Sequence, residues 1–160
     1  MMTALRFTVR ALTIAGAMLL SACAGMRIGS PMPASGPPAT FTPTTSDSRA
    51  TRVITVRDGL TRSAVFRAAS ELLSQRYSVD VSDSRAGFLM TPWQATSTRD
   101  GAPDLRYRTR VVVRFLGDDF KQASVRVDAN WQRGDEWDVG FDVKMLDDVA
   151  AELTARVGKK

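Results

Sequence analysis

Two stretches of strict alternation dominate the second half of the chain. From Tyr107 to Phe115 every second residue is apolar or threonine, and from Ala123 to Trp131 every second residue is apolar. The residues in between are mostly charged or polar. A period of two residues is that of a β-strand with one buried face, and the short polar segment 117–121 suits a turn between antiparallel strands. We therefore predict a long antiparallel hairpin with one buried and one solvated face.

One register of this hairpin satisfies both of its faces. If Leu116 pairs with Gln122, apolar residues face one another on the buried side, and Arg110 faces Asp128 on the solvated side. Opposite charges directly across an antiparallel pair stabilise it. Trp131 has the parity of the buried side, so we expect it in the core.

The chain around the hairpin predicts two amphipathic helices and three shorter strands. One helix is expected over 61–75, with Thr61 as its N-cap, and another over 144–157, with Gly158 as its C-cap. The polar stretch 94–104 is expected to be a loop. The predicted fold is therefore an α+β two-layer sandwich, an antiparallel sheet packed by two helices in the order β-α-β-β-β-β-α. The three shorter strands are expected at 52–57, 77–81 and 87–93, and the alternation over 137–142 leaves open a short last strand before the second helix.

A short secretory signal is predicted at the N-terminus. Arg6 and Arg10 precede an apolar stretch over 11–20, which runs into the small residues before Cys23. A positive segment, a short apolar segment and small residues at a cleavage site characterise secretory signal peptides. The apolar stretch is about half of the roughly 20 residues that a membrane-spanning helix needs. Residues 1–22 are therefore interpreted as a signal peptide.

The end of this segment, Leu20-Ser21-Ala22-Cys23, resembles the lipobox of bacterial lipoproteins, and all four positions match. The resemblance implies cleavage between Ala22 and Cys23 and a diacylglyceryl group on the Cys23 sulfur. It favours the outer membrane, because Ala24 stands where the family's inner-membrane proteins tend to have aspartate. Such acyl chains would anchor the protein at the membrane, with its domain facing the periplasm. The alternative is an ordinary signal peptide followed by an unmodified thiol.

The composition excludes several classes of enzyme. The chain has no histidine, and Cys23 is its only cysteine, so a Ser-His-Asp triad, a Cys-His pair and a His-ligated zinc site are excluded. The acidic residues do not follow the calcium-loop spacing. The formal charge of +5 falls to +3 without Arg6 and Arg10, which is too small to indicate nucleic acid. We therefore expect no catalytic activity, no metal and no cofactor besides the covalent lipid.

Residues 23–50 are predicted to be a lipidated N-terminus and tether ahead of a single domain over 51–160. Five of the seven prolines lie between Pro31 and Pro43, and the segment is rich in serine and threonine. Such a composition cannot bury enough apolar surface to offset the entropy of ordering. The alternative is a segment that folds on a partner, with Phe41 as its anchor.

Several short motifs of the predicted domain are similar to those of a known family: Ala68-Ala69, Leu72-Leu73, Tyr77-Ser78-Val79, the strand 87–93 and Arg106-Tyr107-Arg108. On these residues the domain resembles the helix-grip domains of the BamC lipoproteins, which belong to the outer-membrane β-barrel assembly machinery. The resemblance covers about residues 51–157 and implies a helix-grip fold and a role as an accessory subunit. BamC has two such domains, whereas this chain has room for one, and BamC's partner-gripping N-terminal segment is much reduced here.

The solvated face of the hairpin carries the candidate partner-binding residues. Four arginines share this face, and only Asp128 is placed to neutralise them. A surplus of positive charge on a rigid face steers an acidic partner, and a tryptophan beside a strand end can anchor an interface. The alternative is an ordinary solvated sheet face. The candidate residues are Trp93, Arg106, Arg108, Arg110 and Arg114.

Together these observations predict a non-enzymatic outer-membrane lipoprotein that serves as an adaptor or accessory subunit of an envelope complex. Its expected contacts are the membrane, through the lipid anchor, and an envelope protein. One alternative is a regulator of a periplasmic enzyme, such as one of peptidoglycan synthesis, for which a tether is useful. Another is a carrier of a small ligand or lipid, for which the cleft between helices and sheet has to stay open.

Overall fold

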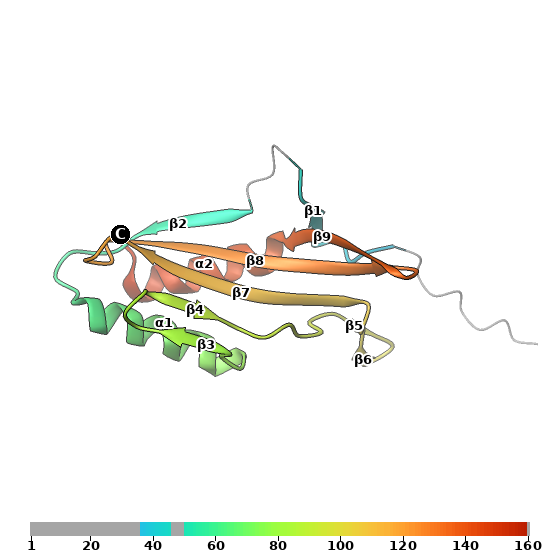
Figure 1. Ribbon diagram of the computed structural model, residues 1–160, viewed down its shortest axis with the longest axis horizontal. Helices are drawn as coiled ribbons and strands as arrows, with labels where there is room; N and C mark the ends of the chain where they lie inside the picture. The colour runs from blue at the N-terminus through green and yellow to red at the C-terminus, as the bar shows by residue number, and fades with distance from the viewer. Residues whose placement is uncertain (1–35, 46–49, 160) are drawn as a thin grey trace, which may run out of the picture. The chain divides into compact units, whose positions relative to one another are not determined.

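A long antiparallel hairpin forms the centre of a computed structural model that describes residues 36–45 and 50–159 (Figure 1). Strand β7 (Tyr107–Leu116) pairs with strand β8 (Gln122–Arg133), and Leu116 lies opposite Gln122 as predicted. The predicted pair Arg110 and Asp128 is also confirmed. The register could be predicted because both strands bury alternate residues over their length.

The remaining strands extend this hairpin on both sides. The order across the sheet is β1-β9-β8-β7-β4-β3, and β2 also pairs with β8. Strands β2 and β9 share one edge of β8, where β2 pairs with residues 122–126 and β9 with residues 128–133. A separate two-stranded hairpin, β5 and β6, lies in the segment predicted to be a loop. The bounds of these strands are Phe41–Pro43 for β1, Thr51–Thr55 for β2, Val81–Asp83 for β3, Phe88–Met90 for β4, Thr98–Arg99 for β5, Ala102–Pro103 for β6 and Glu136–Asp142 for β9.

Two helices cover one face of the sheet, α1 (Arg62–Arg76) and α2 (Val143–Val157). Helix α2 runs behind β7 and β8 in the view of Figure 1. The predicted N-cap Thr61 accepts a hydrogen bond from the Ala64 amide at 3.3 Å, which satisfies a donor at the start of α1. The fold is thus the predicted α+β two-layer sandwich. Neither helix is long and apolar enough to cross a bilayer.

The two faces of the sheet differ in what covers them. We call the face under the helices the inner face and the opposite one the outer face. Four inner-face valines of β7 and β8 are at most 1% exposed, and they pack with residues of both helices in one core. Trp131 is also buried, as predicted. These inner-face residues are Val111, Val113, Val125 and Val127.

Two of the shorter strands differ from the prediction. The strand expected at 77–81 begins only at Val81, because Tyr77 is the C-cap of α1 and donates its amide to the Leu73 carbonyl at 2.7 Å. The strand expected at 87–93 ends at Met90. Pro92 has no amide hydrogen, so the ladder with β7 cannot continue regularly through it.

The end of the predicted tether forms a strand. Within residues 36–45, β1 pairs with β9, and Phe41 lies opposite Asp142. The Phe41 ring packs edge-on against Tyr107, with 6.2 Å between ring centroids. The expectation of a tether over 23–50 is therefore corrected in this part, and the compact unit begins at Gly36. Residue patterning did not indicate this strand, because it is three residues long and has a single large apolar side chain.

Candidate functional site

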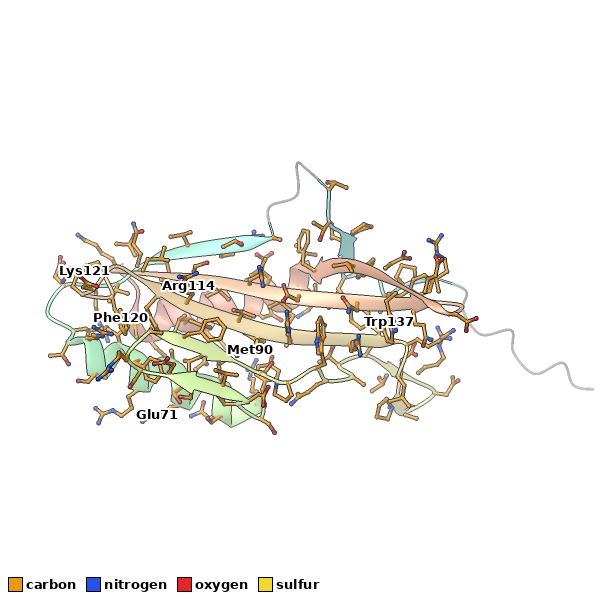
Figure 2. The ribbon with its side chains drawn as sticks, viewed as in Figure 1. Glu71, Met90, Arg114, Phe120, Lys121 and Trp137 are labelled. Atoms are coloured by element: carbon orange, nitrogen blue, oxygen red, sulfur yellow. The ribbon has the colours of Figure 1, made fainter. Side chains whose placement is uncertain are left out.

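The outer face carries the arginines that were predicted to bind a partner. Their side chains alternate with the buried residues of β7, and Arg126 of β8 lies on the same face, opposite Val112. Figure 2 shows Arg114 and Trp137 toward opposite ends of the sheet. Arg114 and Arg126 are exposed, whereas the other three arginines are half-buried. The five outer-face arginines are Arg106, Arg108, Arg110, Arg114 and Arg126.

Arg108 is held by two tryptophans. Its guanidinium carbon lies 5.0 Å from the ring centroid of Trp93 and 4.1 Å from that of Trp137. Attraction between a guanidinium group and an indole ring contributes about 0.5–1 kcal/mol at an exposed site and more where water is excluded. The Arg108 Nε is buried and has no hydrogen-bond partner among the described residues. Arg108 is therefore positioned by stacking rather than by a carboxylate.

Arg110 and Arg126 share one carboxylate. The Nε of Arg110 lies 2.9 Å from one oxygen of Asp128, and the Nε of Arg126 lies 2.7 Å from the other. Arg110 also lies over the ring of Trp93, at 4.7 Å from its centroid. The predicted cross-strand pair is thus present, but the same aspartate serves a second arginine. One negative charge here faces two positive ones.

The remaining two arginines differ from each other. The Nε of Arg106 lies 3.3 Å from the Asp104 carboxylate. Partial burial opposes ionisation of Asp104, but hydrogen bonds and charge from Arg106 outweigh it and lower the pKa of that carboxyl. Arg114 has no ion pair among the described residues. The outer face therefore holds five arginines, and two carboxylates pair with them.

A shallow depression of about 430 Å³ opens on the outer face beside these arginines. Arg110, Arg126 and Asp128 line it together with apolar side chains from β9. Val139 is 63% exposed there, and Phe141 is buried. The outer face is thus more apolar than the solvated face that was predicted.

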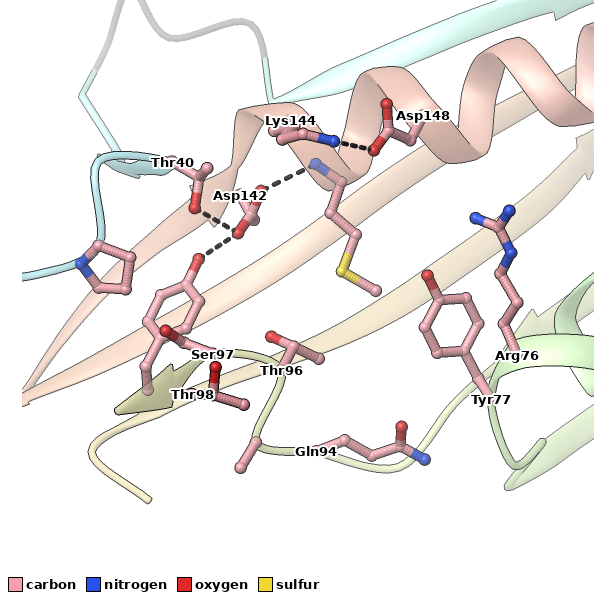
Figure 3. Close-up of a pocket in the computed structure, with 14 residues that line it drawn as sticks. Thr40, Arg76, Tyr77, Gln94, Thr96, Ser97, Thr98, Asp142, Lys144 and Asp148 are labelled. Atoms are coloured by element: carbon pink, nitrogen blue, oxygen red, sulfur yellow. Dashed lines mark hydrogen bonds and ion pairs between the residues drawn. The ribbon is translucent and has the colours of Figure 1, made fainter. Parts of the chain in front are cut away.

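A second cavity of about 660 Å³ lies on the inner side, next to the start of α2 (Figure 3). Asp142, the N-cap of α2, accepts hydrogen bonds from the Tyr107 hydroxyl at 2.6 Å, the Thr40 hydroxyl at 2.7 Å and the Met145 amide at 2.8 Å. Burial raises the pKa of Tyr107, and the hydrogen bond to Asp142 and its charge raise it further. This cavity also borders Lys144, which pairs with Asp148 across one turn of α2 at 2.5 Å.

All the predicted partner-binding residues that the structure describes lie on or beside the outer face. Two more residues, Arg126 and Trp137, belong to this surface. Arg126 could have been placed on this face from the sequence, because the predicted hairpin register pairs it with Val112. The position of Trp137 depends on the register between β9 and β8. The predicted lipidation residue Cys23 and cleavage residue Ala22 lie outside the described residues.

Comparison with known proteins does not assign a family. No protein-family model matches the chain, and no curated protein matches it. Within the part of the chain that the structure describes, no cluster of side chains is arranged to hold a metal ion. Candidate functions therefore have to be argued from the two faces of the sheet.

Proposed function

We propose that this protein is a lipid-anchored adaptor of the bacterial outer membrane, which binds an acidic envelope protein through the outer face of its sheet. The observation that carries the proposal is the excess of five arginines over two paired carboxylates, among the described residues, on a face that neither α1 nor α2 covers. A rigid positive surface accelerates association with an acidic partner. The lipobox-like motif ending at Cys23 supports the anchor.

The outer face differs from an ordinary solvated sheet face. Trp93 and Trp137 stack on Arg108 instead of entering the core, and Val139 is 63% exposed. Tryptophan and arginine are the residue types that most often dominate binding energy at protein interfaces. An outer face that served only solubility would not need these apolar side chains.

The anchor is tested by replacing Cys23 with serine. We expect the Cys23→Ser protein to leave the membrane fraction, because the change removes the only thiol that could be acylated. The measurement is fractionation of cells that express either protein, followed by detection in the outer-membrane pellet. A variant that sediments with outer membranes as completely as the wild type would show that lipidation is not the anchor.

The adaptor function is tested by crosslinking in intact cells and pull-down from solubilised membranes. We compare the wild type with the double variant Arg108→Glu, Arg114→Glu. The matched control is Arg67→Glu, Arg76→Glu, which makes the same charge change at exposed positions of α1, in the helical layer. We expect the outer-face variant alone to lose its specific partner. The identity of that partner would separate a subunit of an assembly complex from a periplasmic enzyme. Equal recovery from all three proteins would contradict the proposal.

The cavity beside α2 favours a second candidate function, the carriage of a small ligand. It stays open between helix and sheet, with a volume of about 660 Å³, and hydroxyl groups of Thr40, Tyr77 and Tyr107 border it. A native mass spectrum of the purified protein tests this candidate. A carried ligand would appear as a constant added mass that denaturation removes, and a spectrum of the bare chain would count against it.

A further inference from the structure

Arg108 differs from the other outer-face arginines in how it is held. Two indole rings contact it, no carboxylate pairs with it among the described residues, and its Nε is buried without a hydrogen-bond partner. The residue is nevertheless half-buried rather than buried, so a ligand can reach it. Arg114, on the same strand and face, is exposed, and no aromatic ring of the described residues lies against it.

This arrangement favours binding of a carboxylate at Arg108. Arg108 lies against Trp93 and Trp137, and its Nε is shielded from water, so part of the cost of desolvating and ordering this side chain is met before a partner binds. Loss of water and of side-chain freedom are the main costs that a new ion pair has to offset. A carboxylate therefore gains more from Arg108 than from Arg114, which is exposed. The planar guanidinium can also donate two parallel hydrogen bonds to the carboxylate.

The depression on the outer face lies next to Arg108, in the direction of Arg110. In the register of β7, β8 and β9, Arg108 shares a row with Asn130 and Val139. The next row on this face holds Arg110, with Asp128 and the buried Phe141 in line. Asn130, Val139 and Phe141 all line the depression. In an extended chain, residues i and i+2 point to the same side and lie about 6.6–6.8 Å apart. An extended segment that runs along these strands can therefore place one side chain over the row of Arg108 and the side chain two residues away over the row of Arg110.

We infer that Arg108 and this depression together form a binding site for an extended acidic segment of a partner protein. A glutamate or aspartate of the segment pairs with Arg108, and an apolar side chain two residues away enters the depression over Val139 and Phe141. The inference rests on the proposed function and adds the chemistry of the partner. A protein segment is favoured over a phosphate headgroup, because a headgroup gives the apolar depression no occupant.

The test uses the full-length protein in a neutral detergent and a fluorescent, end-blocked peptide in which leucine follows glutamate by two positions. Fluorescence anisotropy gives the dissociation constant. Control peptides replace the glutamate by glutamine or the leucine by serine. Glycerophosphoglycerol, the headgroup of an anionic phospholipid, serves as a competing phosphate probe. Thermal unfolding of every variant confirms that it remains folded.

We expect Arg108→Ala to weaken binding of the glutamate peptide by about tenfold or more, and Arg114→Ala, the matched control, by less than about threefold. Arg108→Lys is expected to weaken it nearly as much as Arg108→Ala, because an ammonium group cannot stack and pair as a planar guanidinium does. Val139→Ser should reduce the advantage of leucine over serine in the peptide. The glutamine peptide should not respond to Arg108→Ala.

Other outcomes would overturn the inference in distinguishable ways. Equal losses for Arg108→Ala and Arg114→Ala would remove the specific site but leave the outer face as the acidic-partner surface. Efficient competition by glycerophosphoglycerol would indicate a lipid-headgroup surface and would overturn the protein partner as well. A glutamate peptide that binds no better than the glutamine peptide would show that this face does not recognise carboxylates.

Discussion

The two faces of the β7–β8 hairpin use neighbouring residues for different purposes. Val111 is fully buried beneath the helices, whereas Arg110, the residue before it, reaches the outer face and pairs with Asp128. The inner face consists of closely packed aliphatic side chains, and the outer face of arginines, tryptophans and a few exposed apolar residues. Successive residues of a strand point to opposite faces of the sheet. A residue that stabilises the core and a residue that can contact a partner are therefore neighbours in the sequence. Substitutions at adjacent positions should therefore have different consequences.

The largest effect is expected from a charge on the inner face. Val127→Asp would bury an unpaired carboxylate at a fully buried position, which should lower the free energy of unfolding by more than about 3 kcal/mol. The control is Ser124→Asp, which places the same charge on the outer face of β8. Thermal unfolding followed by circular dichroism measures both. If the two variants unfolded at the same temperature, the proposed difference between the two faces would be contradicted.

A smaller effect is expected where β1 covers the end of the sheet. A methyl group at Gly140 would lie 2.7 Å from Cε2 of Phe41 and would also meet the Thr42 carbonyl. Gly140→Ala should therefore displace β1 and lower the free energy of unfolding by about 1–3 kcal/mol. Amide exchange should show lost protection at Thr44 and Val143, which bond across this junction, while β7 and β8 stay protected. Unchanged protection at both amides would show that β1 tolerates the methyl group.

Tyr107→Phe tests a polar contact of the inner face. It removes the 2.6 Å hydrogen bond to Asp142, which should cost about 1–2 kcal/mol of stability. The raised pKa of Tyr107 adds a pH dependence, because the tyrosine of the unfolded chain ionises first, near pH 10. Its contribution is therefore present below about pH 10 and is lost as the pH rises further.

Urea denaturation of both proteins between about pH 7 and 11 measures this difference. Tyr77 also has a raised pKa, so the wild type and the variant should both lose stability in alkali. The loss should be smaller in the phenylalanine variant. Parallel curves for the two proteins would show that Tyr107 contributes nothing to the pH dependence.

The smallest effect on stability is expected on the outer face. Arg114→Glu should change the free energy of unfolding by less than about 1 kcal/mol, because Arg114 is exposed. It should slow association with an acidic partner, and the difference from wild type should shrink as salt screens the charges. Stopped-flow mixing with the captured partner at several salt concentrations measures this rate. A salt-independent rate would mean that the outer face does not steer the partner electrostatically.

The hairpin could be predicted in detail because local patterning and charge pairing agree on one register. Alternation over both strands places apolar residues together, and Arg110 opposite Asp128 requires the same pairing. The N-cap at Thr61 follows from the side chain alone, because its hydroxyl can reach an amide in the first turn. These features depend on residues that are close in sequence or joined by a short turn.

Features that depend on distant segments could not be predicted in this way. Phe41 packs on Tyr107 only because β9 offers an edge beside it, and a short run rich in proline and threonine carries no sign of that. Trp137 alternates with polar residues, but its contact with Arg108 follows from the register between β9 and β8. The candidate arginines could be identified from the alternation of residues along the predicted strand. The stacking that distinguishes Arg108 could be seen only in the structure, where β9 lies beside β8.

The shared edge of β8 has a consequence for the order of folding. The β7–β8 hairpin closes through a short turn, so its contacts can form early. Strand β2, in contrast, joins β8 across a large part of the chain, with Thr51 opposite Arg126, and the Lys159 amide then bonds to the Thr55 carbonyl. Closing such long loops is entropically costly, so this junction should form late. A chain that emerges from its N-terminus first therefore cannot complete this edge until Lys159 is free.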